Sequence, residues 1–125
     1  MARILIVDDD PRMLRLYSEI LMKEGYDVVI ASDGQQGFQH AVSRKPDLIL
    51  LDVMMPAADG VETLESLSDH PATKGIPVIF LTALVKEDEA EPGAGTIGGR
   101  AYISKSSSRA TFVARVREVV PPDAR

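Results

Sequence analysis

The sequence lacks cysteine, long apolar runs and any secretion signal. The absence of cysteine excludes disulfides, thiolate metal sites and cysteine nucleophiles. The apolar runs, such as residues 48–51, are far shorter than the roughly 18 residues that a membrane-spanning helix needs. The N-terminal segment becomes acidic at Asp8, too early for a signal peptide. We therefore expect a cytoplasmic protein that does not bind membranes.

Basic charge is also scarce. The 125 residues include 14 Lys and Arg against 19 Asp and Glu, a formal net charge of −5. Nucleic-acid binding needs clustered Lys and Arg to neutralise phosphates, and the sequence has no such cluster. We therefore predict no nucleic-acid binding by this domain. The length fits one domain, which we place at residues 1–121, with 122–125 as a tail or the start of a linker.

What the sequence does contain is a regular alternation of short apolar runs with helical patterns. The runs are continuous, as expected of strands in a parallel sheet that helices cover on both faces. They lie at residues 4–7, 28–30, 48–51, 78–81 and 101–103. This pattern predicts an α/β fold with a five-stranded parallel sheet and right-handed crossovers.

The segments between the runs predict helices. The first helix has Asp10 as its N-cap and Pro11 at its first helical position, and it ends at Gly25. Further helices are predicted over residues 34–43, 60–69 and 109–120. Between the fourth and fifth strands, Pro92 and the glycines that follow predict a fourth helix that is short or irregular.

Charged and hydroxyl side chains follow four of the five predicted strands. They are Asp8, Asp9 and Asp10 after the first strand, Asp52 after the third, Thr82 after the fourth and Lys105 shortly after the fifth. Taken singly, Asp10 fits a helix cap, Thr82 a turn hydroxyl and Lys105 a surface lysine. In parallel sheets, however, the carboxyl ends of the strands meet beside the topological switch point, where sites form. Together these residues therefore predict a site.

The chemistry of this site follows from the residue types. Asp8, Asp9 and Asp52 would place three carboxylates in one crevice, where each raises the pKa of the others. A hard divalent cation would offset their charge, and Mg²⁺ fits best. Lys105 would supply a second positive charge and Thr82 a hydroxyl donor. The set predicts phosphoryl transfer, with Asp52 as the carboxylate that accepts the phosphoryl group.

The order and spacing of these residues resemble the receiver domain of two-component response regulators. The family pattern is an acidic pair, then D-x-x-M-P-x-x-D-G around the acceptor, then Thr or Ser, then Lys. Here these elements are Asp8-Asp9, residues 52–60, Thr82 and Lys105. The resemblance implies a flavodoxin-like fold with strand order 2-1-3-4-5. It also implies a signalling module rather than an enzyme, although one that promotes its own phosphoryl transfer and slow self-dephosphorylation.

The resemblance implies a role for each site residue. Asp52 would accept a phosphoryl group from a phosphohistidine on a sensor histidine kinase or a histidine phosphotransfer protein. Asp8, Asp9, Asp52 and the backbone carbonyl of Met54 would bind Mg²⁺. Lys105 would neutralise a phosphoryl oxygen.

A switch is implied as well. After phosphorylation, Thr82 would move to bond another phosphoryl oxygen and Tyr102 would turn inward behind it. This change would alter the affinity for a downstream protein or output domain, and phosphorylation-dependent dimerisation is a further expectation.

Three features differ from the family pattern. Ser106 follows Lys105 where most relatives have Pro after a cis bond, and because a cis non-Pro bond costs about 2.5–4 kcal/mol, we predict a trans bond. The segment 87–99 is predicted to be ordered mainly by phosphorylation or by a partner. Met54 and Leu84 are apolar where polar side chains often assist attacking water, which predicts slow self-dephosphorylation.

Two other functions are compatible with parts of the sequence. A phosphatase of the haloacid dehalogenase type also uses a strand-end Asp, but its D-x-D motif ends in a small or hydroxyl residue that is missing here, and no cap-domain sequence occurs. A receiver-like interaction domain that works without phosphorylation is the alternative that Ser106 leaves open. Nucleotide binding is disfavoured because neither glycine-rich phosphate-binding motif occurs.

Overall fold

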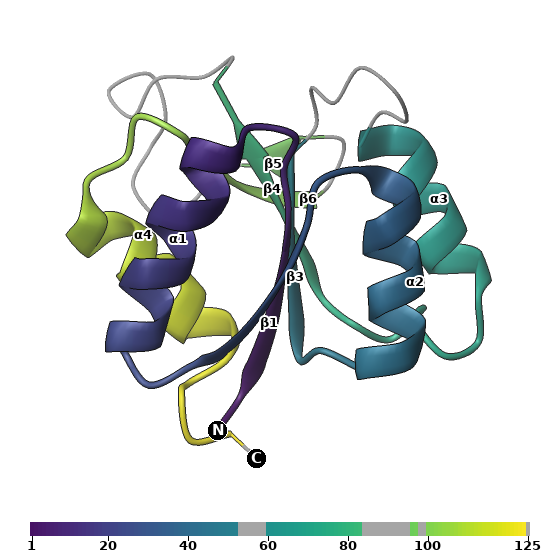
Figure 1. Ribbon diagram of the computed structural model, residues 1–125, viewed down its shortest axis with the longest axis horizontal. Coiled ribbons are helices and arrows are strands. Elements are labelled where there is room, and N and C mark those ends of the chain that lie inside the picture. The colour runs from purple at the N-terminus through teal and green to yellow at the C-terminus, as the bar shows by residue number, and fades with distance from the viewer. Residues whose placement is uncertain (53–59, 84–95, 98–99, 125) are drawn as a thin grey trace.

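A computed structural model describes residues 1–52, 60–83, 96–97 and 100–124 of the chain (Figure 1). Strands and helices alternate along it. The strands are β1 Arg3–Val7, β2 Asp27–Ala31, β3 Leu48–Asp52, β4 Val78–Thr82, β5 Thr96–Ile97 and β6 Arg100–Ser104. The helices are α1 Pro11–Lys23, α2 Gly34–Arg44, α3 Gly60–Asp69 and α4 Arg109–Val119. The α/β class is as predicted.

The strands form one sheet in the order β2-β1-β3-β4-β6-β5. The first five are parallel to their neighbours, so the predicted order 2-1-3-4-5 is confirmed with β6 as the fifth parallel strand. The sixth strand, β5, pairs antiparallel with β6 and was not predicted. It comprises two residues within the segment 87–99, for which we predicted a short or irregular helix. Apart from Thr96–Ile97, the segment lies outside the described residues. The predicted helix therefore lies outside them as well.

Helices cover both faces of the sheet. Figure 1 shows α1 and α4 on one face and α2 and α3 on the other. Because successive strand residues point to opposite faces, each central strand contributes to two cores. Ile4 and Ile6 of β1 pack in the cluster that includes Leu14 and Phe112, whereas Leu5 packs in the cluster with Ala41 and Leu67. This double burial explains why the strands are continuous apolar runs.

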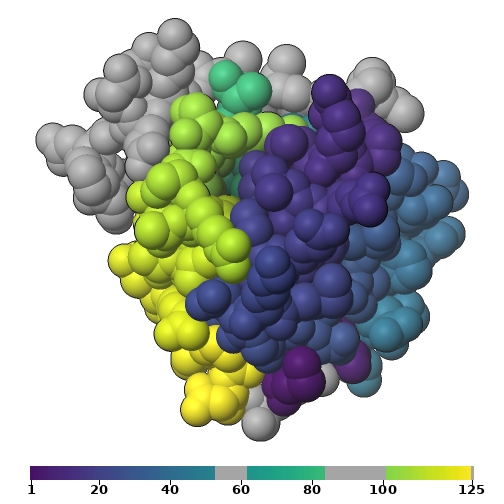
Figure 2. All heavy atoms as spheres, turned by 60° about the vertical axis from the view of Figure 1, so that its left-hand side comes forward, coloured from purple at the N-terminus to yellow at the C-terminus, as the bar shows by residue number. Residues whose placement is uncertain are grey.

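The first helix begins and ends as its sequence predicts. The Asp10 side chain accepts a hydrogen bond from the Arg12 N–H, and Pro11 occupies the first turn. Beyond the C-cap residue Glu24, Gly25 has a φ of 95°, a left-handed conformation that favours glycine. On the buried face, the Tyr17 ring stacks on Phe112 with centroids 4.7 Å apart. Figure 2 shows α1 and α4 lying against each other along this side of the molecule.

The opposite face depends on a close approach of α2 to β1. A Cβ atom at Gly37 would lie 2.7 Å from Cγ2 and 3.0 Å from Cγ1 of Val7. Only a residue without a side chain lets the two backbones come this close. On this face Ala41 and Leu67 are buried, while Phe38 and Leu64 are partly buried against the same cluster.

No helix in the described part of the chain is long and apolar enough to cross a membrane.

Candidate active site

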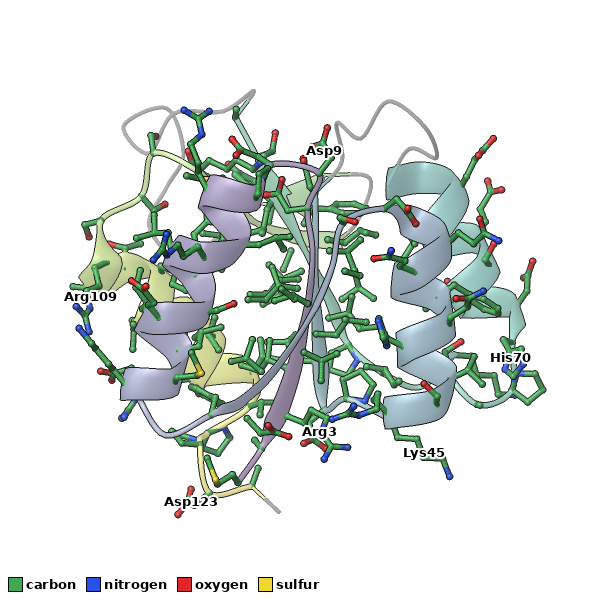
Figure 3. All side chains as sticks on the ribbon, viewed as in Figure 1. Arg3, Asp9, Lys45, His70, Arg109 and Asp123 are labelled. Carbon is green, nitrogen blue, oxygen red and sulfur yellow. The ribbon has the colours of Figure 1, made fainter. Side chains whose placement is uncertain are left out.

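The site lies at the carboxyl-terminal edge of the sheet. Asp9, two residues beyond the end of β1, stands at this edge between the two helical layers, while Arg3 at the start of β1 lies at the other end (Figure 3). The parallel register places the last residues of β1, β3, β4 and β6 along the same edge. The strand-end residues singled out from the sequence therefore meet because all these strands run in one direction.

Asp8 is the most deeply buried carboxylate of the site. Its side chain is fully buried, and its Oδ1 accepts a hydrogen bond from the Asp10 N–H at 2.9 Å. Its Oδ2 lies 2.8 Å from Lys105 Nζ. Burial raises the pKa of Asp8, and the nearby Asp52 charge raises it further, against the lowering effects of Lys105 and the Asp10 N–H. A nearby cation is therefore needed to stabilise the charged form of Asp8.

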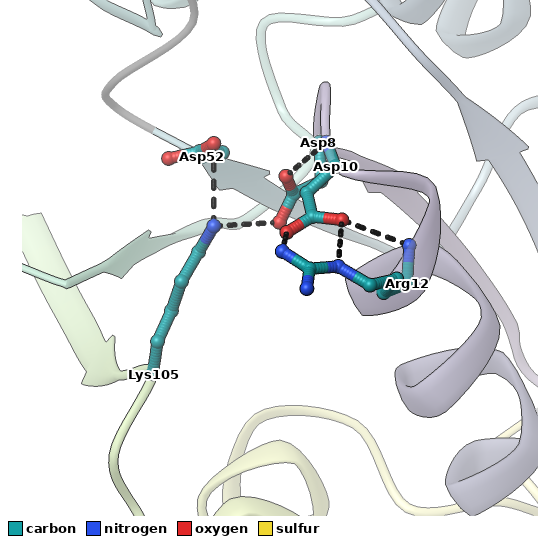
Figure 4. A network of polar contacts seen from close by, with 5 residues as sticks. All are labelled: Asp8, Asp10, Arg12, Asp52 and Lys105. Carbon is teal, nitrogen blue, oxygen red and sulfur yellow. Dashed lines mark hydrogen bonds and ion pairs between the residues drawn. The ribbon is translucent and has the colours of Figure 1, made fainter.

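Lys105 connects two of the three predicted carboxylates. Its Nζ lies 2.8 Å from Asp8 Oδ2 and 3.3 Å from Asp52 Oδ2, which Figure 4 shows as a bridge across the strand ends. Burial by itself would lower the pKa of Lys105, but the bonds and charges of Asp8 and Asp52 together raise it. The lysine is therefore held as an ammonium. The Lys105–Ser106 peptide bond is trans, as predicted.

Asp52 and Asp9 complete the acidic group. Asp52 ends β3 and is 2% exposed, whereas Asp9 is exposed at the rim. One oxygen from each of Asp8, Asp9 and Asp52 can be chosen so that all lie within 4.8 Å of one another. Carboxylate oxygens at this spacing suit a hard cation such as Mg²⁺, which retains several waters. The predicted fourth ligand, the Met54 carbonyl, lies outside the described residues.

The two predicted switch residues are both buried. Thr82 ends β4 with no exposed surface, in register with Ser104 of β6. Tyr102, two residues earlier on β6, is 8% exposed and packs in the cluster with Phe80 and Leu51. The Tyr102 side chain thus lies in the core on the α2–α3 side, within the strand that follows β4 in the sheet.

Asp10 is separate from the acidic group. Besides capping α1, it pairs with Arg12, whose Nη2 lies 3.1 Å from Oδ2, and the bonds from Arg12 lower the pKa of Asp10. Its interpretation as a helix cap is confirmed. Figure 4 shows this pair beside the bridge formed by Lys105.

The sequence matches a known family model over most of its length. Residues 4–117 match the model of the response regulator receiver domain. The chain belongs to the receiver domain family of response regulators.

Relatives and solved structures agree with this assignment. The receiver is 41% identical over 120 residues to the DNA-binding dual master transcriptional regulator RpaA of Synechocystis, covering 96% of this chain and 49% of that protein. It therefore spans about half of RpaA. The chemotaxis protein CheY4 of Vibrio cholerae shares its fold with a TM-score of 0.82 at 26% identity, covering 96% of this chain and 99% of CheY4.

A third neighbour bears on the metal. The receiver domain of the sensor histidine kinase PA1611 from Pseudomonas aeruginosa matches with a TM-score of 0.78 and 28% identity, covering 94% of this chain and 96% of that one. That protein was solved with a magnesium ion coordinated in its active-site cleft. The acidic group of this receiver, Asp8, Asp9 and Asp52, has the donor chemistry for the same kind of ion.

Sequence reasoning did not single out the Ser104 side chain, which directly precedes Lys105. Ser104 ends β6, is 5% exposed, and its Oγ accepts a hydrogen bond from the Ser106 N–H. The available signal was a hydroxyl residue directly before Lys105. A serine at a strand end is common enough that this signal alone would not have singled it out.

Proposed function

We propose that this receiver accepts a phosphoryl group on Asp52 with the help of Mg²⁺, and that phosphorylation switches its binding to other proteins. The observation that carries the proposal is the bridge of Lys105 Nζ between Asp8 and Asp52 beside the exposed carboxylate of Asp9. It combines an acceptor carboxylate, a fixed cation and ligands for a second cation in one place. Phosphoryl transfer needs these parts because its catalysis is mostly positioning and charge neutralisation.

The transfer is a displacement at phosphorus. A carboxylate oxygen of Asp52 forms a bond to phosphorus, and the bond from phosphorus to the donor's imidazole nitrogen breaks. The bonding pair stays on that nitrogen, and a proton that the other ring nitrogen takes from solvent makes the leaving group a neutral imidazole. Mg²⁺ held by Asp8, Asp9 and Asp52, with the Met54 carbonyl as a further proposed ligand, would neutralise charge on the phosphoryl oxygens.

Lys105 and Asp8 have different electrostatic roles: Lys105 neutralises negative charge at the acceptor, and Asp8 holds Lys105 in place. Before transfer, the Lys105 ammonium lies between Asp8 and Asp52, so Asp8 holds it at the acceptor. After transfer, the same ammonium is within reach of a phosphoryl oxygen on Asp52 and forms a charge-assisted hydrogen bond there. Asp8 has no exposed surface, so the atoms packed around it limit its movement during this exchange.

The proposed readout passes through Thr82 and Tyr102. The Thr82 hydroxyl would bond a phosphoryl oxygen, and the space it leaves would be taken by the Tyr102 side chain. Both side chains are buried, so such a shift must repack the sheet edge and its neighbouring surface. The donor would be a sensor histidine kinase or a histidine phosphotransfer protein, and the readout a changed affinity for a downstream partner or a second copy of the domain.

Intact-protein mass spectrometry after incubation with acetyl phosphate tests the acceptor. We expect a gain of one phosphoryl mass that depends on Mg²⁺ and disappears in Asp52→Asn. Asp69→Asn is the matched control because it removes an exposed carboxylate at the end of α3 and should leave the gain intact. An unphosphorylated wild-type protein at saturating Mg²⁺ would contradict the proposal and favour an interaction domain that works without phosphorylation.

A further inference from the structure

We propose that Ser104 and Ser106 are positioning residues whose paired hydroxyls hold the turn that directs Lys105 toward Asp8 and Asp52. The inference rests on the proposed function, because it concerns the ammonium of that site. It assigns a role to Ser104, which follows no expectation from the sequence, and to Ser106, which the sequence marked only as a difference from the family pattern.

The turn itself is built around Ser104. The Ser107 N–H donates to the backbone oxygen of Ser104 at 3.0 Å, and the Ser106 N–H donates to Ser104 Oγ at 3.2 Å. Ser104 Oγ and Ser106 Oγ lie 2.8 Å apart, so one hydroxyl donates to the other. Ser104 is 5% exposed, and water therefore competes little for its hydroxyl. Ser104 thus accepts the hydrogen bonds from both amides that close the turn.

Lys105 lies inside this turn and is held on both sides. Its own N–H donates to Thr82 O at 2.7 Å, which continues the pairing of β6 with β4 by one residue. The next amide, that of Ser106, is held by Ser104 Oγ. From this anchored backbone the Lys105 side chain reaches Asp8 and Asp52 across the strand ends (Figure 4).

The serine at position 106 gives the Ser104 hydroxyl a backbone donor to bind. Ser106 carries an N–H that needs an acceptor, and Ser104 Oγ supplies one within the turn. A side chain without an oxygen at position 104 would leave that amide to water, and the backbone of Lys105 would gain freedom. A lysine has a long side chain with several rotatable bonds, so its ammonium follows its backbone. Displacements of about 1 Å near reacting groups change rates strongly.

A comparison of Ser104→Ala and Ser106→Ala with Ser107→Ala tests the proposal. Ser107→Ala is the matched control, because it removes a hydroxyl from the same turn but keeps the N–H that donates to Ser104 O. Ser104→Thr keeps the hydroxyl and should therefore behave like the wild type. Two quantities are measured on each variant: the Mg²⁺ dissociation constant by calorimetric titration, and the initial rate of phosphorylation by acetyl phosphate at saturating Mg²⁺.

The two quantities should move in opposite senses. A loosened Lys105 repels Mg²⁺ less, so we expect Ser104→Ala to bind Mg²⁺ about threefold more tightly, in the same direction as Lys105→Ala. A loosened Lys105 also neutralises the phosphoryl oxygen less well, so the rate should fall about tenfold. Ser106→Ala keeps its N–H and should show the same pattern more weakly. Ser107→Ala and Ser104→Thr should stay within about twofold of the wild type.

Other outcomes would overturn the proposal. Unchanged Mg²⁺ affinity in Ser104→Ala would mean that the hydroxyl does not hold Lys105. Weaker Mg²⁺ binding together with a slower rate and a lower melting temperature would show damage to the fold instead. The two proposals also fail separately. A wild-type protein that takes up no phosphoryl group contradicts the proposed function, whereas the Mg²⁺ affinities still decide whether the serines position Lys105.

Discussion

At the scale of single residues, the site is organised by one ammonium that two buried carboxylates share. Lys105 Nζ is closer to Asp8 than to Asp52, at 2.8 Å against 3.3 Å. The pKa of Asp8 is nevertheless raised, mainly by burial and also by the Asp52 charge. One ammonium therefore does not fully compensate the acidic group, and a divalent cation should stabilise the folded protein.

Replacement of Asp8 should greatly reduce this stabilisation by Mg²⁺. At a Mg²⁺ concentration about 100 times the dissociation constant, binding to the folded state adds about 2.7 kcal/mol to the free energy of unfolding of the wild-type protein. In Asp8→Asn the added stability should fall to less than about 1 kcal/mol. Thermal unfolding with Mg²⁺ and with a chelator measures this difference, and Asp69→Asn serves as control. An Mg²⁺ effect of equal size in Asp8→Asn would disprove a role for Asp8 in metal binding.

The lifetime of the phosphorylated state is a second prediction at this scale. Met54 and Leu84 are apolar, and we predict that they shield the acyl phosphate from attacking water. The double variant Met54→Asn, Leu84→Glu should therefore lose its phosphoryl group about tenfold faster. The measurement is the decay of phosphorylated mass after removal of acetyl phosphate. Met22→Asn, at an exposed position of α1, is the control; equal decay in both variants would remove the support for shielding.

At the scale of elements, the close packing of α2 on β1 depends on a missing side chain. A Cβ at Gly37 would meet both methyl groups of Val7, which is fully buried in β1 and cannot move away freely. The helix would have to shift, and β1 ends directly before Asp8 and Asp9. The contact therefore connects helix packing to the geometry of the acidic group.

Gly37→Ala should consequently destabilise the protein by about 1–3 kcal/mol, the usual cost of overpacking a core. Gly75→Ala is the matched control, because a Cβ there meets nothing within 4 Å. The urea midpoint of unfolding at constant m-value measures both variants. Equal midpoints for Gly37→Ala and the wild type would show that α2 can move outward without cost.

Local sequence patterns predicted most of these elements but not the short strand β5. The continuous apolar runs predicted five parallel strands because burial on both faces leaves no polar positions, and Asp10, Pro11 and Gly25 predicted the ends of α1. β5 was missed because Thr96–Ile97 is too short to show a periodicity. Its strand conformation is defined by pairing with Arg100 and Ala101 of β6, an interaction that local pattern does not reveal.

At the scale of the whole molecule, the two ends of the described chain are joined opposite the site. Figure 1 places the N- and C-terminal ends together at the lower end of the sheet. The Ala2 N–H donates to Pro122 O at 2.8 Å, and the buried Tyr26 hydroxyl donates to Val120 O at 2.6 Å. These bonds connect residues that are far apart in the sequence, so they form only when the domain is complete.

Tyr26→Phe tests this closure. Loss of the buried hydrogen bond should lower the free energy of unfolding by about 1–2 kcal/mol at neutral pH. Burial raises the pKa of Tyr26 in the folded protein, so its contribution is fully present below the unfolded pKa of about 10 and is lost as pH rises above it. Unfolding midpoints of the wild type and Tyr26→Phe should therefore converge in alkaline solution. A difference that persists unchanged to high pH would contradict this assignment.

The sequence alone predicted the fold class and, through the family pattern, the strand order, and it singled out Asp8, Asp9, Asp52 and Lys105, which the fold brings together. These predictions were possible because strands buried on both faces appear in the sequence as continuous apolar runs, and because parallel strands bring their last residues to one edge of the sheet. The folded molecule was needed to learn which carboxylate lies closer to Lys105, how deeply Tyr102 is buried, and that Ser104 closes the turn beside Lys105. These features depend on distances between side chains from different strands and on the path of one turn, and neither is encoded in a local pattern.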